Sequence, residues 1–294
     1  GQGISNAVGM AVAEKYLAEY YNRKDFPVID YNIYSIAGDG CLQEGISSEA
    51  CSLAGHLGLD NLVVIYDDNS ITIDGSTDIS FTEDVVARYE AYGWKVITVD
   101  GDGDDIYAIE IALNEARAVN TAPVLIKLRS HIGYGSPNFQ DSHKAHGSPL
   151  GEDEVRLIKE NMGWDPDKSF VVPDPVRDDF AEVGAKGKEA QNAWEQMFSG
   201  YKREHSDLAS EFNDALSGKL PVDLASVLPD FKAGEAVATR KASGKVLSAV
   251  MPGLPMIMAG SADLTPSNNT HFEGAGDFQK GAWSGRYIRY GVRE

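Results

Sequence analysis

Cysteine is scarce in this sequence: Cys41 and Cys51 are the only two among 294 residues. A chain of this length cannot build a disulfide framework from two thiols, so we interpret both as buried small apolar residues of a reducing compartment. The sequence thus favours a protein that is not secreted, and both the cytoplasm and the plastid stroma fit. Long apolar runs are also missing, and none approaches the ~20 residues that a membrane-spanning helix needs.

Basic residues are few as well, with 26 Lys and Arg against 45 Asp and Glu and a formal net charge of −19. Nucleic acids and anionic membranes both require a basic face, so neither is expected as a partner. The acidic residues are spread along the chain, as on a well-solvated surface. Hydrophobic residues make up 43% and charged residues 24%, the balance of an ordinary globular protein.

The two ends carry no terminal signals. The sequence starts at Gly1 without an initiator Met, and nothing near Glu294 indicates a natural stop. The first residues have neither the basic region of a signal peptide nor the Arg-rich pattern of a transit peptide. We therefore expect an internal fragment of a longer protein.

The first half of the chain alternates between strand and helix patterns. After a helix over residues 1–22, β-rich or apolar runs predict four strands, and amphipathic stretches predict the helices between them. The strands are expected at 31–37, 61–66, 94–99 and 123–128, and the helices at 43–57, 83–92 and 104–119. This order predicts an α/β fold, a parallel sheet with helices on both faces.

The second half is expected to be mostly helical. A long loop over residues 129–150 precedes a short helix at 152–162, a connector at 165–187 and one long amphipathic helix from Trp194 to Ala215. Beyond it, a helix at 236–250 and a strand at 255–259 indicate the start of a second α/β domain. We therefore divide the chain into a domain over 1–220, a linker over 221–232 and a partial domain over 233–294.

The strongest chemical signal lies at two strand ends. Gly38-Asp39-Gly40 closes the first predicted strand, and Asp67-Asp68-Asn69 closes the next one. Parallel strands bring their carboxyl ends to one edge of the sheet, where such folds bind ligands. One carboxylate and one amide oxygen, completed by diphosphate oxygens, are suitable ligands for Mg²⁺, and glycines let the backbone approach a phosphate.

This pair of motifs resembles the thiamine-diphosphate motif, and its surroundings resemble the transketolase family. The similar stretches follow the family's order from the first residue to the last: 1–9, 38–47, 66–69, 133–138, 238–240, 260–264 and 289–294. The resemblance implies a diphosphate-binding domain over most of the chain, followed by the beginning of the pyrimidine-binding domain. It also implies that the family's start and its C-terminal half are missing.

The resemblance assigns the cofactor contacts to particular residues. Asp39, Asn69 and the backbone carbonyl of Ile71 would ligate Mg²⁺, with Ca²⁺ or Mn²⁺ as substitutes, and the Gly38 amide would contact a phosphate oxygen. Ile73 would support the cofactor from its apolar side.

Further matches concern catalysis and the substrate. Glu294 matches the glutamate that hydrogen-bonds the aminopyrimidine ring of the cofactor, and Asp263 an aspartate near that ring. His146 matches a histidine that contacts the diphosphate and the sugar hydroxyls. Arg240 and Ser267 match sugar-phosphate ligands, a sensible clamp since Arg offers a planar fork of donors.

Two other patterns have simpler interpretations. His143 and His146 have the His-x-x-His spacing of some zinc sites, but no third ligand lies near them in the sequence. Glu44 and Glu49 match carboxylates at the family's subunit interface, and a charged helix face is the alternative interpretation.

The resemblance implies an enzyme, a transketolase of the pentose phosphate pathway or the Calvin cycle. It would move a two-carbon ketol unit from a ketose phosphate to an aldose phosphate through a thiamine-diphosphate adduct. A homodimer with active sites between the subunits is implied too. Two alternatives stay open: a dihydroxyacetone synthase that uses formaldehyde as acceptor, and a non-catalytic fragment that only binds cofactor or a partner.

Overall fold

The computed structural model describes residues 1–293, which form two compact units. The first unit consists of Gly1–Val12 and Tyr31–Lys186, and the second of Ala13–Asp30 and Gly187–Glu294. Two helices, α1 (Gln2–Tyr21) and α7 (Asp174–Glu204), each contribute to both units. No helix within the described residues is both long enough and apolar enough to cross a membrane.

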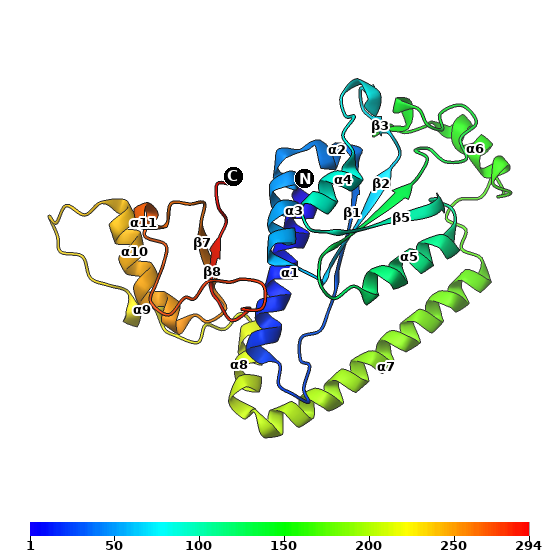
Figure 1. Cartoon of the computed structure of the whole chain (residues 1–294). Helices are drawn as coiled ribbons and strands as arrows, with labels where there is room; N and C mark the ends of the chain where they lie inside the picture. Colours follow the sequence, from blue (N-terminus) through cyan, green and yellow to red (C-terminus); the bar gives the residue numbers. More distant parts are fainter. Residues whose placement is uncertain (294) are drawn as a thin grey trace. The chain divides into compact units, whose positions relative to one another are not determined.

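The first unit is built on a sheet of four parallel strands in the order β1-β2-β6-β5 (Figure 1). Apolar residues fill the two central strands, as expected where both faces of a parallel sheet are covered. The strands span Ile33–Gly38 (β1), Leu62–Asp68 (β2), Val124–Arg129 (β6) and Lys95–Asp102 (β5).

Helices cover both faces of this sheet. Alternate residues of β2 point to opposite sides, and Val63 joins a core cluster with Ala112 and Ala116 of α5 (Ile106–Ala118). Figure 1 shows α3 (Gly45–Leu57) on the other side of the sheet from α5. The predicted α/β fold, a parallel sheet with helices on both faces, is confirmed.

The remaining elements of the first unit are short. The loop expected over 129–150 contains only one 3₁₀ turn, and a hydrogen bond from His131 Nδ1 to Asp141 (2.9 Å) joins the start of the loop to its middle. The elements are α2 (Asp39–Gln43), β3 (Ile71–Thr72), β4 (Gly75–Ser76), η1 (Thr77–Ile79), α4 (Val85–Ala91), η2 (His143–Ala145) and α6 (Glu152–Asn161).

The second unit has an aromatic core and a small sheet. Tyr21, Phe198, Tyr201 and Phe212 are buried together, where α7 packs with the end of α1 and with the next helix. Two parallel strands, β7 and β8, form the sheet. After α7 this unit contains α8 (Ser206–Leu216), α9 (Leu224–Val227), α10 (Thr239–Val250), η3 (Met251–Gly253), β7 (Ala259–Ser261), α11 (Thr265–Asn268) and β8 (Tyr287–Arg289).

Two helix predictions for this region were wrong. Half of the expected connector at 165–187 belongs to α7, which begins at Asp174 with Pro175 in its first turn, where proline is tolerated. The single helix expected from Trp194 to Ala215 is interrupted at His205, whose φ of −131° and ψ of 54° are not helical.

The strand expected at 255–259 starts later, at Ala259. The guanidinium group of Arg286 donates hydrogen bonds to the carbonyls of Met251, Leu254 and Ile257. Because these bonds hold the segment in turns, its backbone is not free to pair as a strand before Ala259.

Candidate cofactor site

Two neighbouring strand ends bring the predicted metal ligands to one edge of the sheet. In the parallel pair β1–β2, Gly38 lies opposite Asp67, so Asp39 and Asn69 both follow where the strands end. The helix expected at 43–57 is α3, which begins at Gly45, and a separate five-residue helix, α2, begins at Asp39 directly after the strand. A break at Glu44 separates it from α3.

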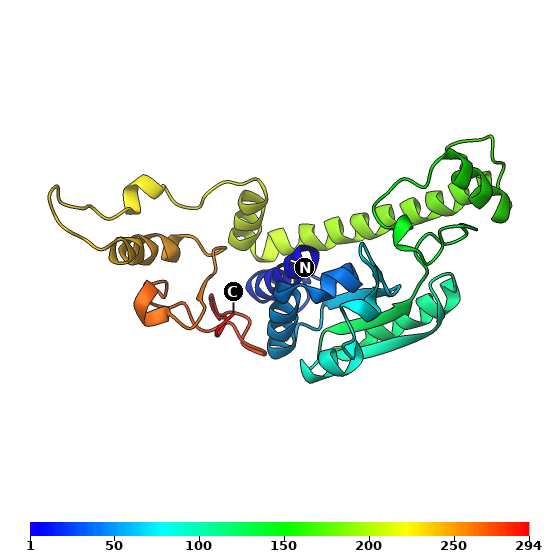
Figure 2. The ribbon, with the colours of Figure 1, turned by 90° about the horizontal axis from the view of Figure 1, so that it is seen from above.

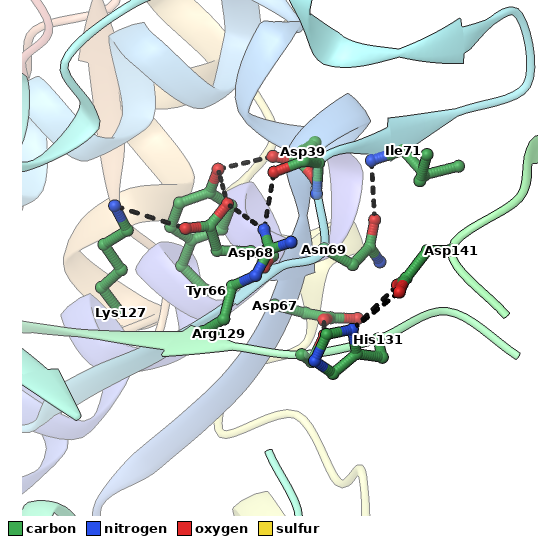
Figure 3. Close-up of polar contacts among 12 residues, drawn as sticks. Asp39, Tyr66, Asp67, Asp68, Asn69, Ile71, Lys127, Arg129, His131 and Asp141 are labelled. Atoms are coloured by element: carbon green, nitrogen blue, oxygen red, sulfur yellow. Dashed lines mark hydrogen bonds and ion pairs between the residues drawn. The ribbon is translucent and has the colours of Figure 1, made fainter. Parts of the chain in front are cut away.

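Asp39 is held by the loop that contains Asn69 (Figure 3). Its side chain is 3% exposed, and one carboxylate oxygen accepts a hydrogen bond from the Ser70 amide (2.9 Å). The other oxygen accepts one from the Tyr66 hydroxyl (2.5 Å). Asn69 Oδ1 accepts from the Ile71 amide (3.0 Å), which closes a tight turn with Ser70 in the left-handed region at φ 60°.

The electrostatic environment of Asp39 is unfavourable for its own charge. Burial raises the pKa of the Asp39 carboxyl, and the nearby carboxylates of Asp68 and Asp67 add to the rise. Hydrogen bonds from Tyr66 and Ser70 oppose it but do not reverse it. A cation bound beside Asp39 would therefore relieve a buried negative charge.

Basic side chains flank this cluster on the neighbouring strand. Lys127 Nζ lies 3.3 Å from Asp68 Oδ2, and Arg129 Nη1 donates a hydrogen bond to Ser70 Oγ (2.7 Å) (Figure 3). Sequence reasoning missed both residues, although the signal was present. Two basic residues alternate at the end of the otherwise apolar β6, opposite Tyr66 and Asp68 of β2.

A cavity of about 290 Å³ opens beside Asp39. Tyr66 and Lys127 form part of its wall, together with residues from the segment between β4 and α4. The lining residues are Asp39, Tyr66, Asp68, Thr77, Phe81, Glu83, Asp84, Val85 and Lys127.

The residues at this edge suit a hard divalent cation. Within residues 1–293 no group of three or more His, Cys, Asp or Glu side chains is placed to hold a metal. The predicted ligands need no such group, because they are one carboxylate (Asp39), one amide oxygen (Asn69) and one carbonyl (Ile71), with diphosphate oxygens to complete the shell. Asp39 is buried, forms no ion pair with a described residue and lies beside the Asn69 turn, so these residues fit a metal–diphosphate group.

Ile71 and Ile73 lie in the hairpin that follows. Ile71 is partly buried in β3, whereas Ile73 stands between β3 and β4 with 70% of its surface exposed. The exposed Ile73 side chain is therefore accessible to a ligand.

The other predicted residues belong to other segments of the chain. His146 is exposed after η2, and its amide donates to the His143 carbonyl rather than to any group near Asp39. Arg240 and Ser267 belong to the second unit, in α10 and α11. The following two residues complete the set: Asp263, at φ 61° after β7, and Glu294, which lies outside the described residues.

The two cysteines differ from each other. Cys51 is fully buried on α3, and burial raises the pKa of its thiol to about 11, which makes it unreactive. Its sulfur lies 3.4 Å from the Tyr89 hydroxyl. Cys41 on α2 is only partly buried, so the expectation of two buried thiols was wrong for Cys41.

Comparison with known proteins gives the same family along the whole chain. Residues 1–221 match the thiamine diphosphate binding domain of transketolase, and residues 235–294 match its pyrimidine binding domain. Transketolase 1 of Saccharomyces cerevisiae is 52% identical over 301 residues, and the transketolase of Nostoc is 46% identical over 295. Each alignment covers all of this chain but only 44% of the relative.

Solved structures agree with this match. A Pichia stipitis transketolase in complex with sedoheptulose 7-phosphate superposes with a TM-score of 0.95 at 47% identity, over all of this chain and 44% of that one. The transketolase of Leishmania mexicana gives 0.94 at 44% identity with the same coverage. The chain therefore belongs to the transketolase family and carries its thiamine-diphosphate-binding domain.

Proposed function

We propose that the protein containing this chain is a transketolase, which transfers a two-carbon ketol unit from a ketose phosphate to an aldose phosphate. The observation that carries the proposal is the buried Asp39 carboxylate, held beside the Asn69 turn by the Ser70 amide. The chain spans less than half of its relatives, so the reaction belongs to the whole protein. Such a reaction would serve the pentose phosphate pathway or the Calvin cycle.

The first unit would anchor the cofactor. Asp39, Asn69 and the Ile71 carbonyl would hold Mg²⁺, and the Gly38 amide would contact a phosphate oxygen of the cofactor. Ile73 would press against the apolar side of the cofactor. When bound, thiamine diphosphate supplies the carbon nucleophile that carries the two-carbon unit.

Other residues would contact the aminopyrimidine ring of the cofactor and the sugar. Glu294 would exchange a hydrogen bond with the aminopyrimidine ring, and Asp263 would lie near that ring. The positive φ of Asp263 supports a functional role, because non-glycine residues in this region concentrate at functional sites. His146, on an exposed loop, would contact the diphosphate and the sugar hydroxyls.

The function is tested with the whole protein and two sugar phosphates. With Mg²⁺ and thiamine diphosphate, xylulose 5-phosphate and ribose 5-phosphate should yield a seven-carbon and a three-carbon product. Formaldehyde in place of ribose 5-phosphate should be a much poorer acceptor. Cofactor binding without any transfer between the two sugars would contradict the proposal.

Arg240 and Ser267 are expected to act on the substrate phosphate. Arg240→Ala or Ser267→Ala should raise KM for xylulose 5-phosphate about tenfold or more, because a charge-assisted phosphate bond contributes ~1.5–3 kcal/mol. The measurement is steady-state kinetics with this donor and with hydroxypyruvate, which has no phosphate.

The unphosphorylated donor is the internal control for this prediction. With hydroxypyruvate the two variants should behave nearly as the wild type does. Equal losses with both donors would mean that Arg240 and Ser267 act on something other than the phosphate.

We further propose a homodimer in which Glu294 of one subunit completes the cofactor site of the other. Asp39→Asn and Glu294→Gln should then each inactivate the protein when present in both subunits. Mixed dimers should contain one site with both defects and one intact site. If half the dimers are mixed, activity should recover to about a quarter of the wild-type value. Subunit exchange without recovery would place Glu294 and Asp39 of one active site in the same subunit.

A further inference from the structure

A basic cavity of about 980 Å³ lies in the second unit, and none of the proposed cofactor or sugar-phosphate residues lines it. Four basic side chains line it: Lys241, Lys245, His271 and Arg289. No acidic residue stands among the described residues that line it, although the chain holds 45 acidic and 26 basic residues. Arg240 and Ser267 do not belong to the lining.

One wall of this basic pocket is a face of α10. Lys241, Lys245 and Ser248 follow each other at helical spacing and are exposed. Neither lysine forms an ion pair with a described residue, and Lys245 Nζ lies 5.6 Å from the centre of the Phe231 ring. Both ammonium groups are therefore free to bind an anion.

The position of this wall is fixed by a close approach of α10 to the end of α11. A Cβ on Gly244 would lie 2.7 Å from the Cβ of Asn269, so only glycine fits at this contact. Figures 1 and 2 both show α10 and α11 side by side.

Two other lining residues, His271 and Arg289, pack against the buried Tyr287 ring. The guanidinium group of Arg289 lies 4.9 Å from the centre of the Tyr287 ring. It donates hydrogen bonds to Asp277 Oδ1 (2.9 Å) and to Thr265 Oγ1 (3.3 Å). These contacts hold the guanidinium group in one orientation. The His271 ring meets Tyr287 edge-on at 5.0 Å. Arg289 thus lines the cavity from a fixed position, with its charge partly balanced by Asp277.

We propose that this basic pocket binds a small polyanion that carries two or more phosphate groups. Its basic side chains come from α10, from β8 and from the segment between α11 and β8, and linked phosphates can contact more of them than a single phosphate can. The cavity volume exceeds what a single phosphate fills, and Ser248 and Asn269 add uncharged donors. The proposal is independent of the proposed transfer reaction.

Inorganic tripolyphosphate is the probe, titrated calorimetrically into the purified protein at low ionic strength. EDTA is present, so that the region near Asp39 cannot take the anion through a divalent cation. The double variant Lys241→Gln/Lys245→Gln should bind about tenfold or more weakly, because two charge-assisted contacts are lost. Lys186→Gln/Lys188→Gln, which removes two exposed lysines of α7, should bind as the wild type does.

Acetylation gives a second readout that does not depend on a variant. Tripolyphosphate should slow the acetylation of Lys241 and Lys245 but not of Lys186 and Lys188, as measured by peptide mass spectrometry. Arg240→Ala should weaken binding less than Lys241→Gln/Lys245→Gln does. The proposal is overturned if tripolyphosphate does not bind, if the Lys241→Gln/Lys245→Gln variant keeps full affinity, or if Arg240→Ala abolishes binding instead.

Discussion

Asp39→Asn is expected to weaken metal-dependent binding of thiamine diphosphate about a hundredfold or more, while the metal-free protein keeps at least its wild-type stability. The first effect follows because even residues behind a metal ligand change affinity ~10–100-fold, and Asp39 would be a ligand itself. The second follows because burial raises the pKa of Asp39, so its charge opposes folding when no cation is bound.

The raised pKa of Asp39 also predicts how the stability difference between the wild type and Asp39→Asn changes with pH. A carboxyl whose pKa is higher in the folded than in the unfolded state favours folding only while it is protonated. This contribution is therefore lost as the pH rises from the unfolded pKa through the folded pKa. Without metal, the wild type should lose stability relative to Asp39→Asn over that interval. Thermal unfolding in EDTA measures this difference, and calorimetric titration with Mg²⁺ present measures cofactor affinity.

Asp25→Asn is the matched control, since Asp25 is exposed in the turn after α1. It should change neither cofactor affinity nor the pH dependence of unfolding. Unchanged cofactor affinity in Asp39→Asn would remove Asp39 from the metal site. A large loss of metal-free stability in the same variant would mean that its bonds to Tyr66 and Ser70 outweigh the cost of burying the charge.

The sequence predicted the neighbourhood of this site because strand ends obey a simple geometric rule. Both motifs stood directly after apolar runs, and parallel pairing then placed Gly38 opposite Asp67. The Ser70 amide bond to Asp39 could not be predicted, because it depends on a left-handed residue within a turn. Lys127 and Arg129 were not predicted as part of the site for a similar reason, because the register of β6 against β2 is known only from the folded sheet.

The helix predictions for α7 and α8 were wrong where helical periodicity and burial do not coincide. Val176, Phe180 and Val183 recur at helical spacing in α7, yet all three are exposed, and the neighbouring prolines suggested a connector. The break at His205 left no trace in the apolar pattern. The ring centres of Phe198 in α7 and Phe212 in α8 lie 5.4 Å apart within one aromatic cluster. The apolar pattern therefore continues across the break.

A second large effect is expected at Gly55, where α3 closely approaches the segment that leads into β5. A Cβ at this position would lie 1.9 Å from the Tyr92 carbonyl oxygen and 3.2 Å from Trp94 Cδ1. Neither neighbour can easily move. Trp94 is buried, and its indole N–H donates to the Cys51 carbonyl of α3 (2.8 Å), which fixes the segment against the helix.

Gly55→Ala should therefore lower the free energy of unfolding by about 2–3 kcal/mol. Alanine in place of glycine gains ~1 kcal/mol of helix propensity, but the overlap with backbone requires α3 or residues 92–94 to shift, at a cost of ~3 kcal/mol or more. The cost exceeds the gain, so the net effect is a loss. Urea unfolding followed by circular dichroism measures it.

Gly184→Ala separates the gain in helix propensity from the cost of the overlap. Gly184 is also helical, but it lies on the exposed part of α7, and a Cβ there would have nothing within 4 Å. This variant should be stabilised by up to ~1 kcal/mol, since only the propensity gain remains. A Gly55→Ala protein as stable as Gly184→Ala would mean that α3 does not touch the Tyr92 carbonyl. A lower free energy of unfolding in Gly55→Ala and a higher one in Gly184→Ala would locate the close approach at Gly55.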